Sequence, residues 1–237
     1  MMRNFKMLLA YDGSRYRGWQ RLGDSDRTIQ GKLEACLTAL LQQPVQVSGA
    51  GRTDAGTHAI GQAASFRAET ALPTAQLPED IGVLDLQEAA PRFHARLNAV
   101  CKTYRYRVWV SDQPCVFDRK YVYVCPGAYD LAAMRQAAET LLGSHDFLAF
   151  SANRPGKKST VRRLDALTIE KTGEELIFTL TGDGFLHHMV RILVGTLLEI
   201  GAGARPVSSI AEIFASGCRA NAGVTVPAQG LCLMEVQ

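Results

Sequence analysis

The order of the strand-like and helix-like patterns constrains the fold of this chain more than any single motif does. Alternating apolar residues predict strands at residues 61–68 and 100–110, and a turn with a further strand, but no helical pattern, lies between them. The second half contains a predicted hairpin that turns at residues 171–174. Because strands follow strands without strict alternation with helices, the sequence predicts an α+β fold with mostly antiparallel sheets backed by helices.

Helical periodicity marks several further segments. One helix is expected to follow Thr28, a residue suited to the N-cap, and to run to Gln42, after which residues 45–50 alternate as a strand. A second is expected from the capping residue Asp130 to Leu142. A third segment, "LHHMVRILVGTLLEIGAG", repeats apolar residues every three or four positions and ends in glycine.

Each half of the chain therefore combines strands with helices, and we expect two domains of similar content. The boundary is placed at residue 107. The N-terminal domain is then residues 1–107, and the C-terminal domain is residues 108–237.

Basic residues are unevenly distributed, although the net charge of the 237 residues is only +3. They gather in three stretches while the acidic residues concentrate elsewhere, which is typical of a groove that binds nucleic acid. The alternative is that they are ordinary solvated surface side chains. The three stretches contain Arg15, Arg17, Arg21 and Arg27; Arg92, Arg96, Lys102, Arg105 and Arg107; and Arg154, Lys157, Lys158, Arg162 and Arg163.

Composition excludes several classes of protein. No apolar run approaches the ~20 residues that span a bilayer, and the start of the chain lacks the apolar stretch of a secretory signal. The six cysteines form no C-x-x-C pair and do not cluster with the five histidines, so we expect free thiols and no metal site. These features predict a cytoplasmic protein without membrane contact.

The segment "SGAGRTDAGTHA", residues 48–59, holds the first candidate for chemistry. A dinucleotide loop would need a further glycine where this chain has Asp54, and a carboxylate there would repel a pyrophosphate. The glycines around Asp54 let the backbone come close to a ligand, which favours a reactive carboxylate. The alternative is an ordinary aspartate of a turn.

Tyr104 and Tyr106 lie in the strand pattern "KTYRYRV". Alternation places both tyrosines and Lys102 on one face of the strand. An aromatic pair beside basic residues can form a platform for stacking nucleobases, at roughly 1–3 kcal/mol per base. The alternative is a pair of core tyrosines.

Arg191 interrupts the apolar helix pattern at "HHMVRILVG". Either it lies on the polar face, or it points inward and meets a carboxylate, because an unpaired buried charge is too costly. Such a pair at ~4 Å gains about 4 kcal/mol of Coulomb energy at an effective dielectric near 20, before desolvation. The neighbouring His187 and His188 either contact phosphate or lie at the start of the helix.

Taken together, these segments resemble the tRNA pseudouridine synthase A family over nearly the whole chain. The matching blocks follow the family order: "YDGSRYRGWQ", "TIQGKLEACL", "SGAGRTDAGTHA", "FHARLNAVCKTYRYRV", "GSHDFLAF", "DGFLHHMVRILVGTLLEIG" and "AGVTVPAQGLCL". The chain departs from the family pattern at Thr57, where valine is frequent, and at Leu97, where phenylalanine is frequent. Neither position touches the expected chemistry.

The resemblance implies an isomerase that converts uridine to pseudouridine at positions 38, 39 and 40 in the anticodon stem-loop of tRNA. It also implies a homodimer without cofactor or metal, with two α+β halves of RNA-recognition-like topology and an active-site cleft between them. By matching positions, Asp54 is the catalytic aspartate, Tyr104 the active-site tyrosine and Arg191 the partner of the aspartate. Arg52 matches an arginine that assists base flipping.

The same interpretation assigns His58, Arg15, Arg17 and Lys102 to substrate binding. One alternative is a catalytically silent RNA-binding module, although a binder gains nothing from an acid that faces phosphates. Another is a glycosidase-like hydrolase that pairs Asp54 with a second carboxylate, Asp183. Release of free uracil would distinguish the hydrolase from the isomerase.

Overall fold

The computed structural model describes residues 2–69, 78–153, 156 and 158–237, and these form two compact units. The first unit comprises Met1–Val100 and Cys232–Gln237, and the second comprises Cys101–Leu231. The boundary expected at residue 107 lies inside strand β5 (Lys102–Trp109), all of which belongs to the second unit. Two residues of the third basic stretch, Arg154 and Lys157, lie outside the described residues.

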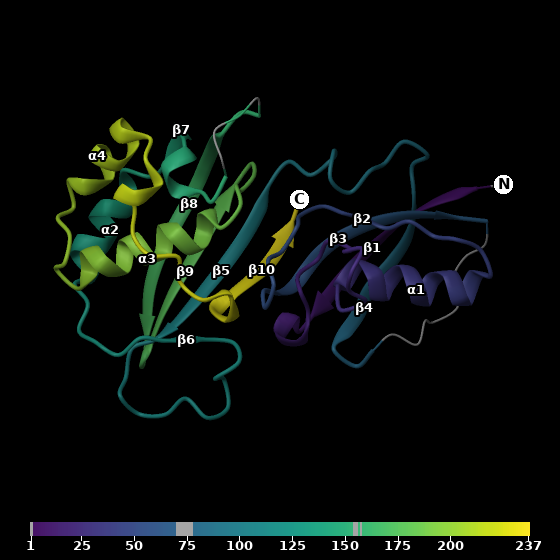
Figure 1. Ribbon diagram of the computed structural model, residues 1–237, viewed down its shortest axis with the longest axis horizontal. Coiled ribbons are helices and arrows are strands. Elements are labelled where there is room, and N and C mark those ends of the chain that lie inside the picture. Colours follow the sequence, from purple (N-terminus) through teal and green to yellow (C-terminus); the bar gives the residue numbers. More distant parts are fainter. Residues whose placement is uncertain (1, 70–77, 154–155, 157) are drawn as a thin grey trace. The chain divides into compact units, whose positions relative to one another are not determined.

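The first unit is built on an antiparallel sheet in the order β4-β1-β3 (Figure 1). Strand β2 pairs antiparallel with β3, and the last strand of the chain, β10, runs parallel to β3. The bounds are β1 (Arg3–Tyr11), β2 (Ser48–Gly49), β3 (His58–Ala68), β4 (Ile81–Ala89) and β10 (Leu231–Val236).

Helix α1 (Ile29–Leu41) of the first unit begins where the sequence predicts. The side chain of Thr28 accepts a hydrogen bond from the amide of Gly31 at 3.2 Å, and this satisfies a donor that the first turn leaves unpaired. Gln42, which follows the helix, has a left-handed backbone with φ of 53°, and this ends the helical hydrogen bonding. The predicted helix is confirmed at both ends.

The strand expected at residues 45–50 is mostly wrong, since only β2 within it pairs with a neighbouring strand. Side chains of α1 take the backbone donors of this segment instead. The amide of Val45 donates to the hydroxyl of Thr38 at 3.2 Å, and the amide of Val47 donates to the carboxylate of Glu34 at 3.0 Å. An alternating sequence pattern cannot show that side chains of a helix, and not a neighbouring strand, accept the amides of this segment.

The second unit contains an antiparallel sheet in the order β5-β9-β8-β7, with the short strand β6 parallel to β5. The bounds are β6 (Tyr123–Val124), β7 (Gly143–Asp146), β8 (Val161–Thr172) and β9 (Glu175–Gly182). The turn between β8 and β9 falls within the predicted residues 171–174, so the expected hairpin is confirmed.

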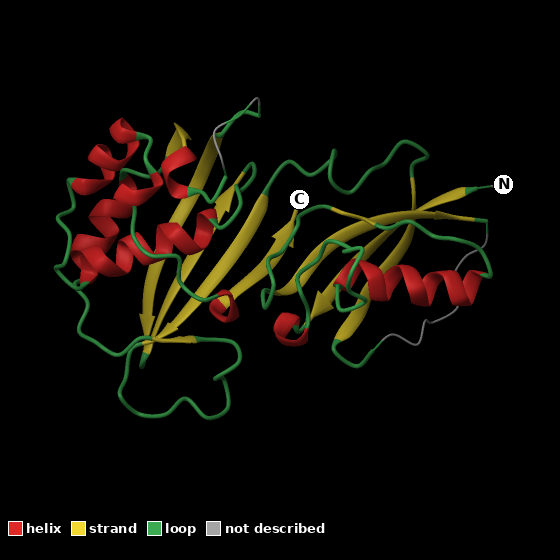
Figure 2. Cartoon of the chain, in the orientation of Figure 1, coloured by secondary structure: helices red, strands yellow, loops and turns green. Residues whose placement is uncertain are grey.

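Helices α2 (Leu131–Glu139) and α3 (Met189–Gly201) of the second unit pack against each other, with α2 on β8 and α3 on β5 (Figure 2). Their close approach depends on Gly201, because a Cβ atom there would lie 2.4 Å from the sulfur of Met134. Helix α2 ends earlier than predicted. The residues that follow α2 bond to carbonyls only three positions back, which tightens the chain before Gly143.

The remaining described elements are a short helix and several 3₁₀ turns. Helix α4 (Ser209–Ser216) precedes the turn η3 (Arg219–Asn221). The other 3₁₀ turns are η1 (Gly13–Arg15), η2 (Leu148–Phe150) and η4 (Ala228–Gly230). The α+β class with mostly antiparallel sheets is confirmed. Among the described helices, none combines the length and the apolar character that crossing a bilayer requires.

We predict that Asp130→Ala destabilises the second unit by about 1 kcal/mol, because it removes the N-cap of α2. One carboxylate oxygen of Asp130 accepts hydrogen bonds from the amides of Ala132 and Ala133 at 2.9 and 3.0 Å. Asp130→Ser retains a capping oxygen and is expected to keep most of the stability. Denaturant unfolding followed by circular dichroism measures both variants, and equal losses for alanine and serine would contradict the capping role.

Candidate active site

Asp54 lies on the loop between β2 and β3, on backbone that is fixed from both sides. The carbonyl oxygen of Thr53 accepts a hydrogen bond from the amide of Trp19 at 3.0 Å. The amide of Gly56 donates to the carbonyl of Tyr16 at 3.2 Å. Asp54 is half-buried between these two anchor points. The loop therefore presents a partly exposed carboxylate from a backbone that has little freedom to move.

Buried polar side chains also hydrogen-bond to the loop at Gly51 and Thr53. The hydroxyls of Tyr11 and Thr53 are 2.8 Å apart, and the side-chain amide of Gln62 donates to the carbonyl of Gly51 at 2.8 Å. Burial raises the pKa of Tyr11 well above its usual range, so its hydroxyl remains a proton donor. This group was not predicted from the sequence. The signal was Gln62, a polar side chain between the small residues Gly61 and Ala63 of β3.

Two glycines allow the segment that follows β1 to pack closely against the Asp54 loop. Gly18 has φ of +91°, and a Cβ atom there would lie 2.6 Å from the carbonyl oxygen of Thr53. A Cβ atom on Gly13 would lie 2.0 Å from the carbonyl oxygen of Thr57. Both glycines belong to the block "YDGSRYRGWQ", which is therefore the backbone support of the loop that carries Asp54.

His58 is only 5% exposed, and its ring supports the neighbouring turn. The amide of Gly13 donates to Nδ1 of His58 at 3.1 Å, so the ring holds the backbone of this turn. Asp12 lies 3.2 Å from the same nitrogen, and it accepts the amide and hydroxyl of Ser14 at 2.9 and 2.6 Å. The buried ring is suited to positioning the loop, whereas we expected His58 to contact the substrate.

The Asp54 loop and the segment that packs against its backbone carry exposed arginines. Arg15, Arg17 and Arg52 are all exposed. Arg17 makes an ion pair with Asp24 at 3.4 Å, and such an exposed pair contributes little to stability. Two nitrogens of Arg27 donate to the carbonyl of Arg15 at 3.2 and 3.0 Å, which shapes the loop that displays these charges.

Tyr104 lies on β5 of the second unit, and the predicted alternation along this strand is confirmed. Tyr104 and Tyr106 are buried on one face, whereas Arg105 is exposed on the other. The ring of Tyr104 meets the ring of Phe185 edge-on, with 5.1 Å between the centroids, which sets its orientation. Lys102 begins the strand and is half-buried.

Arg191 lies half-buried in the first turn of α3, and its guanidinium is anchored within the second unit. Its Nε donates to the carbonyl oxygen of Val226 at 2.7 Å, and the amide of Val226 approaches the carbonyl of Arg191 at 3.4 Å. The hydroxyl of Tyr106 donates to the adjacent carbonyl of Pro227 at 2.6 Å. Burial raises the pKa of Tyr106, and the charge of Arg191 opposes this shift, so the two side chains share one environment.

The chain enters α3 through an unusual backbone. His188 has φ of 61°, a left-handed conformation that side chains other than glycine rarely adopt. The carbonyl of His187 accepts a hydrogen bond from the amide of Ala152 at 2.9 Å, and the two histidine rings lie 3.8 Å apart between centroids. Strained residues of this kind concentrate at functional sites. No feature of the sequence predicts this conformation.

Asp183, the second carboxylate of the hydrolase hypothesis, extends the β8–β9 pairing. Its carboxylate accepts the amide of Arg163 at 2.9 Å, and its own amide donates to the carbonyl of Arg163 at 3.1 Å. This arrangement favours a structural role for Asp183.

Comparisons with known proteins give a consistent assignment. A family model described as tRNA pseudouridine synthase matches residues 137–237. The tRNA pseudouridine synthase A of Geotalea uraniireducens (strain Rf4) is 41% identical and covers 99% of both chains. That of Halalkalibacterium halodurans is 42% identical over 97% of this chain and 90% of the relative. The tRNA pseudouridine synthase A 2 of Bacillus cereus (strain ZK / E33L) is 38% identical over the full length of both.

Among solved structures, a chain in "Crystal Structure of a Cbf5-Nop10-Gar1 Complex" has a TM-score of 0.42 and 11% identity, and it covers 97% of this chain and 48% of its own. That likeness is too low to carry an argument. The full-length similarity to the relatives is sufficient by itself: this chain belongs to the tRNA pseudouridine synthase A family of isomerases.

Proposed function

We propose that this protein converts uridine to pseudouridine at positions 38, 39 and 40 in the anticodon stem-loop of tRNA. The observation that carries the proposal is Asp54, a half-buried carboxylate on a loop whose backbone is fixed on both sides. A protein that only bound RNA would gain nothing from an acid held in this way. We further propose that the enzyme works in the cytoplasm as a homodimer, without a metal or cofactor.

The reaction rearranges bonds within one nucleotide. The bond between ribose C1′ and uracil N1 breaks, the uracil turns over, and a bond forms between C1′ and C5. The proton on C5 is then lost and N1 is protonated, so no atoms are gained or lost overall. A base stacked in a helix hides the reacting bond, and the nucleotide must therefore flip out, at a cost of a few kcal/mol.

Each proposed catalytic residue has a role in these steps. Asp54 acts as the nucleophile on the sugar or base, or as the base that removes a ribose proton. Arg191 pairs with Asp54 and keeps the carboxylate ionised. We propose that the Nη groups of Arg191 make this pair, because Nε donates to the carbonyl of Val226. Tyr104 stacks on the uracil, and Arg52 fills the space that the flipped base leaves.

The remaining contacts concern the RNA around the reacting nucleotide. Arg15, Arg17 and Lys102 are proposed to bind the phosphate backbone. We propose that His58 supports substrate binding indirectly, by holding the turn at Gly13. Its ring is buried and accepts the amide of that residue. The hydrolase alternative is disfavoured because Asp183 is engaged by the amide of Arg163.

We predict that Asp54→Asn lowers the rate of pseudouridine formation by at least about 10³-fold, because the amide can act neither as a nucleophile nor as a base. Binding of tRNA should change little, since the variant adds no negative charge. Pseudouridine mapping and filter binding measure the two effects. Asp85→Asn is the matched control, because Asp85 is an exposed acid of the same unit, on β4, and should keep full activity. Equal activity of the Asp54→Asn variant would contradict the proposal.

We predict that Gly18→Ala destabilises the first unit by about 2–4 kcal/mol and abolishes most activity, because it combines backbone strain with a clash against Thr53. Gly23→Ala is the control, since no atom lies within 4 Å of a Cβ placed there. Thermal unfolding and pseudouridine formation are measured for both variants. If the two alanines behaved alike, the support of the Asp54 loop by Gly18 would be excluded.

We predict that Arg15→Ala and Arg17→Ala each weaken tRNA binding and lower the slope of log K against log salt by about 0.7–0.9. Arg3→Ala is the control, because Arg3 is paired with Glu88 on the sheet. Titrations of tRNA at several salt concentrations measure the slope. An unchanged slope in both variants would place these side chains outside the RNA interface.

A further inference from the structure

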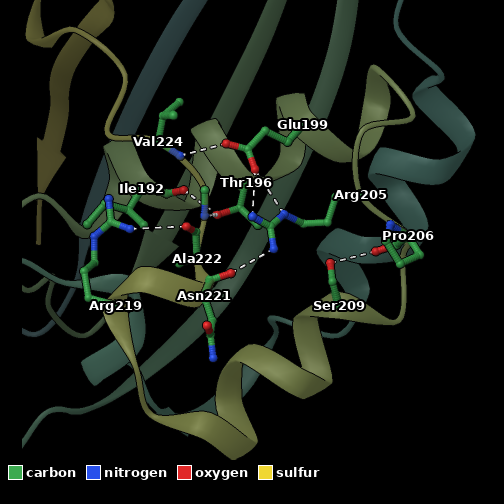
Figure 3. Close-up of polar contacts among 11 residues, drawn as sticks. Ile192, Thr196, Glu199, Arg205, Pro206, Ser209, Arg219, Asn221, Ala222 and Val224 are labelled. Atoms are coloured by element: carbon green, nitrogen blue, oxygen red, sulfur yellow. Dashed lines mark hydrogen bonds and ion pairs between the residues drawn. The ribbon is translucent and has the colours of Figure 1, made fainter.

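Residues 221–227 form a strap along helix α3, and all of them except Asn221 belong to the block "AGVTVPAQGLCL", which contains none of the candidate site residues. Figure 3 shows part of this strap, from Asn221 to Val224, and the side chains of α3 that hold it. The far end of the strap carries Val226, whose carbonyl oxygen accepts the Nε–H of Arg191 at 2.7 Å. The position of the strap therefore decides where the guanidinium of Arg191 lies.

Glu199 connects α3 to the strap through both of its carboxylate oxygens. One oxygen accepts the amide of Val224 at 2.9 Å. The other accepts Nε and Nη2 of Arg205 at 3.0 and 2.9 Å, and Nη1 of Arg205 donates to the carbonyl of Asn221 at 2.8 Å (Figure 3). One side chain thus reaches the strap directly at Val224 and, through Arg205, at Asn221.

Thr196 and two glycines bring the strap close enough for these bonds. The hydroxyl of Thr196 donates to the carbonyl of Ile192 at 2.8 Å and accepts the amide of Gly223 at 2.9 Å. A Cβ atom on Gly195 would lie 2.0 Å from the carbonyl oxygen of Val224, and one on Gly223 would lie 2.6 Å from the Cα of Thr196. The backbones of helix and strap therefore touch directly.

Hydrogen bonds, more than side-chain packing, hold the middle of the strap. The side chain of Val224 is 60% exposed, so it supplies little burial. Arg191 and Glu199 are eight residues apart on one helix, about 12 Å along its axis at 1.5 Å per residue. Glu199 thus holds the strap at Val224 and, through Arg205, at Asn221. The strap in turn orients Arg191 through the carbonyl of Val226.

We propose that Glu199 is a positioning residue for Arg191, acting through the amide of Val224 and the carbonyl of Val226. A long arginine side chain has many rotamers, and a hydrogen bond to Nε selects among them only if the acceptor is itself fixed. Glu199 contributes to that fixation, together with the hydroxyl of Tyr106, which donates to the carbonyl of the next residue, Pro227, at 2.6 Å. This inference rests on the proposed role of Arg191 in pseudouridine formation.

The kinetic test compares Glu199→Ala with Glu199→Gln. The alanine variant is expected to lower kcat for pseudouridine formation on the order of 10-fold with KM unchanged, because the catalytic group is misplaced while RNA contacts remain. The glutamine variant keeps an oxygen for the amide of Val224 and should recover most of kcat. Asp165→Ala is the control, because it removes only an exposed pair with Arg163 and should leave kcat unchanged.

A second measurement reports on Arg191 without using activity. In protein labelled with ¹⁵N-arginine, the Nε–H signal of Arg191, identified by its loss in Arg191→Lys, should exchange with solvent slowly in the wild type. We expect exchange at least about 10-fold faster in Glu199→Ala, because the acceptor at Val226 is no longer fixed. Ile169→Val, a mild truncation of a buried core residue, should leave the exchange slow even as it lowers the melting temperature.

The outcomes separate this inference from the proposed function. If the wild type forms no pseudouridine, the proposed function fails, and the Nε–H exchange still decides whether Glu199 positions Arg191. If Glu199→Ala lowers only the melting temperature, with kcat and exchange unchanged, the positioning role is overturned. Should Glu199→Ala fail to fold, Arg205→Gln removes the ion pair with Glu199 and the link to Asn221 but leaves the bond between Glu199 and Val224. It is expected to show the same effects at smaller size, and unchanged exchange in that variant overturns the inference.

Discussion

The carbonyl oxygen of Thr53 accepts a hydrogen bond from the amide of Trp19, and this contact fixes the residue directly before Asp54. A carboxylate on a flexible loop would sample many positions and would lose orientational entropy each time it reacted. Gly18 allows the two backbones to approach, because no larger residue fits between them. The position of the proposed catalytic acid thus depends on contact between two segments of main chain.

The second unit positions its charged residue by the same physical means. Arg191 bonds to the carbonyl of Val226, and the strap that carries this carbonyl lies against α3 because Gly195 leaves room for it. Main-chain groups are suitable anchors, since they have no rotamers to lose. Glu199 and Thr196 then fasten the strap where its exposed side chains cannot.

Much of the local structure could be predicted from the sequence because it rests on interactions between near neighbours. The cap at Thr28, the turn between β8 and β9, and the alternation of Tyr104 with Arg105 all involve residues within a few positions of one another. The segment at residues 45–50 was mispredicted because its amides bond to side chains of α1, as at Val47 and Glu34. Local periodicity contains no information about such distant acceptors.

The α+β class and the family could be read from the sequence alone, and so could the candidate residues for the chemistry, because periodicity, capping and ordered motifs all lie along the chain. The three-dimensional fold alone shows that His58 is buried beside the turn at Gly13, and that Val226 holds the guanidinium of Arg191 from 35 residues away. Those outcomes depend on which main-chain groups meet in space. Such meetings are set by the packing of whole elements.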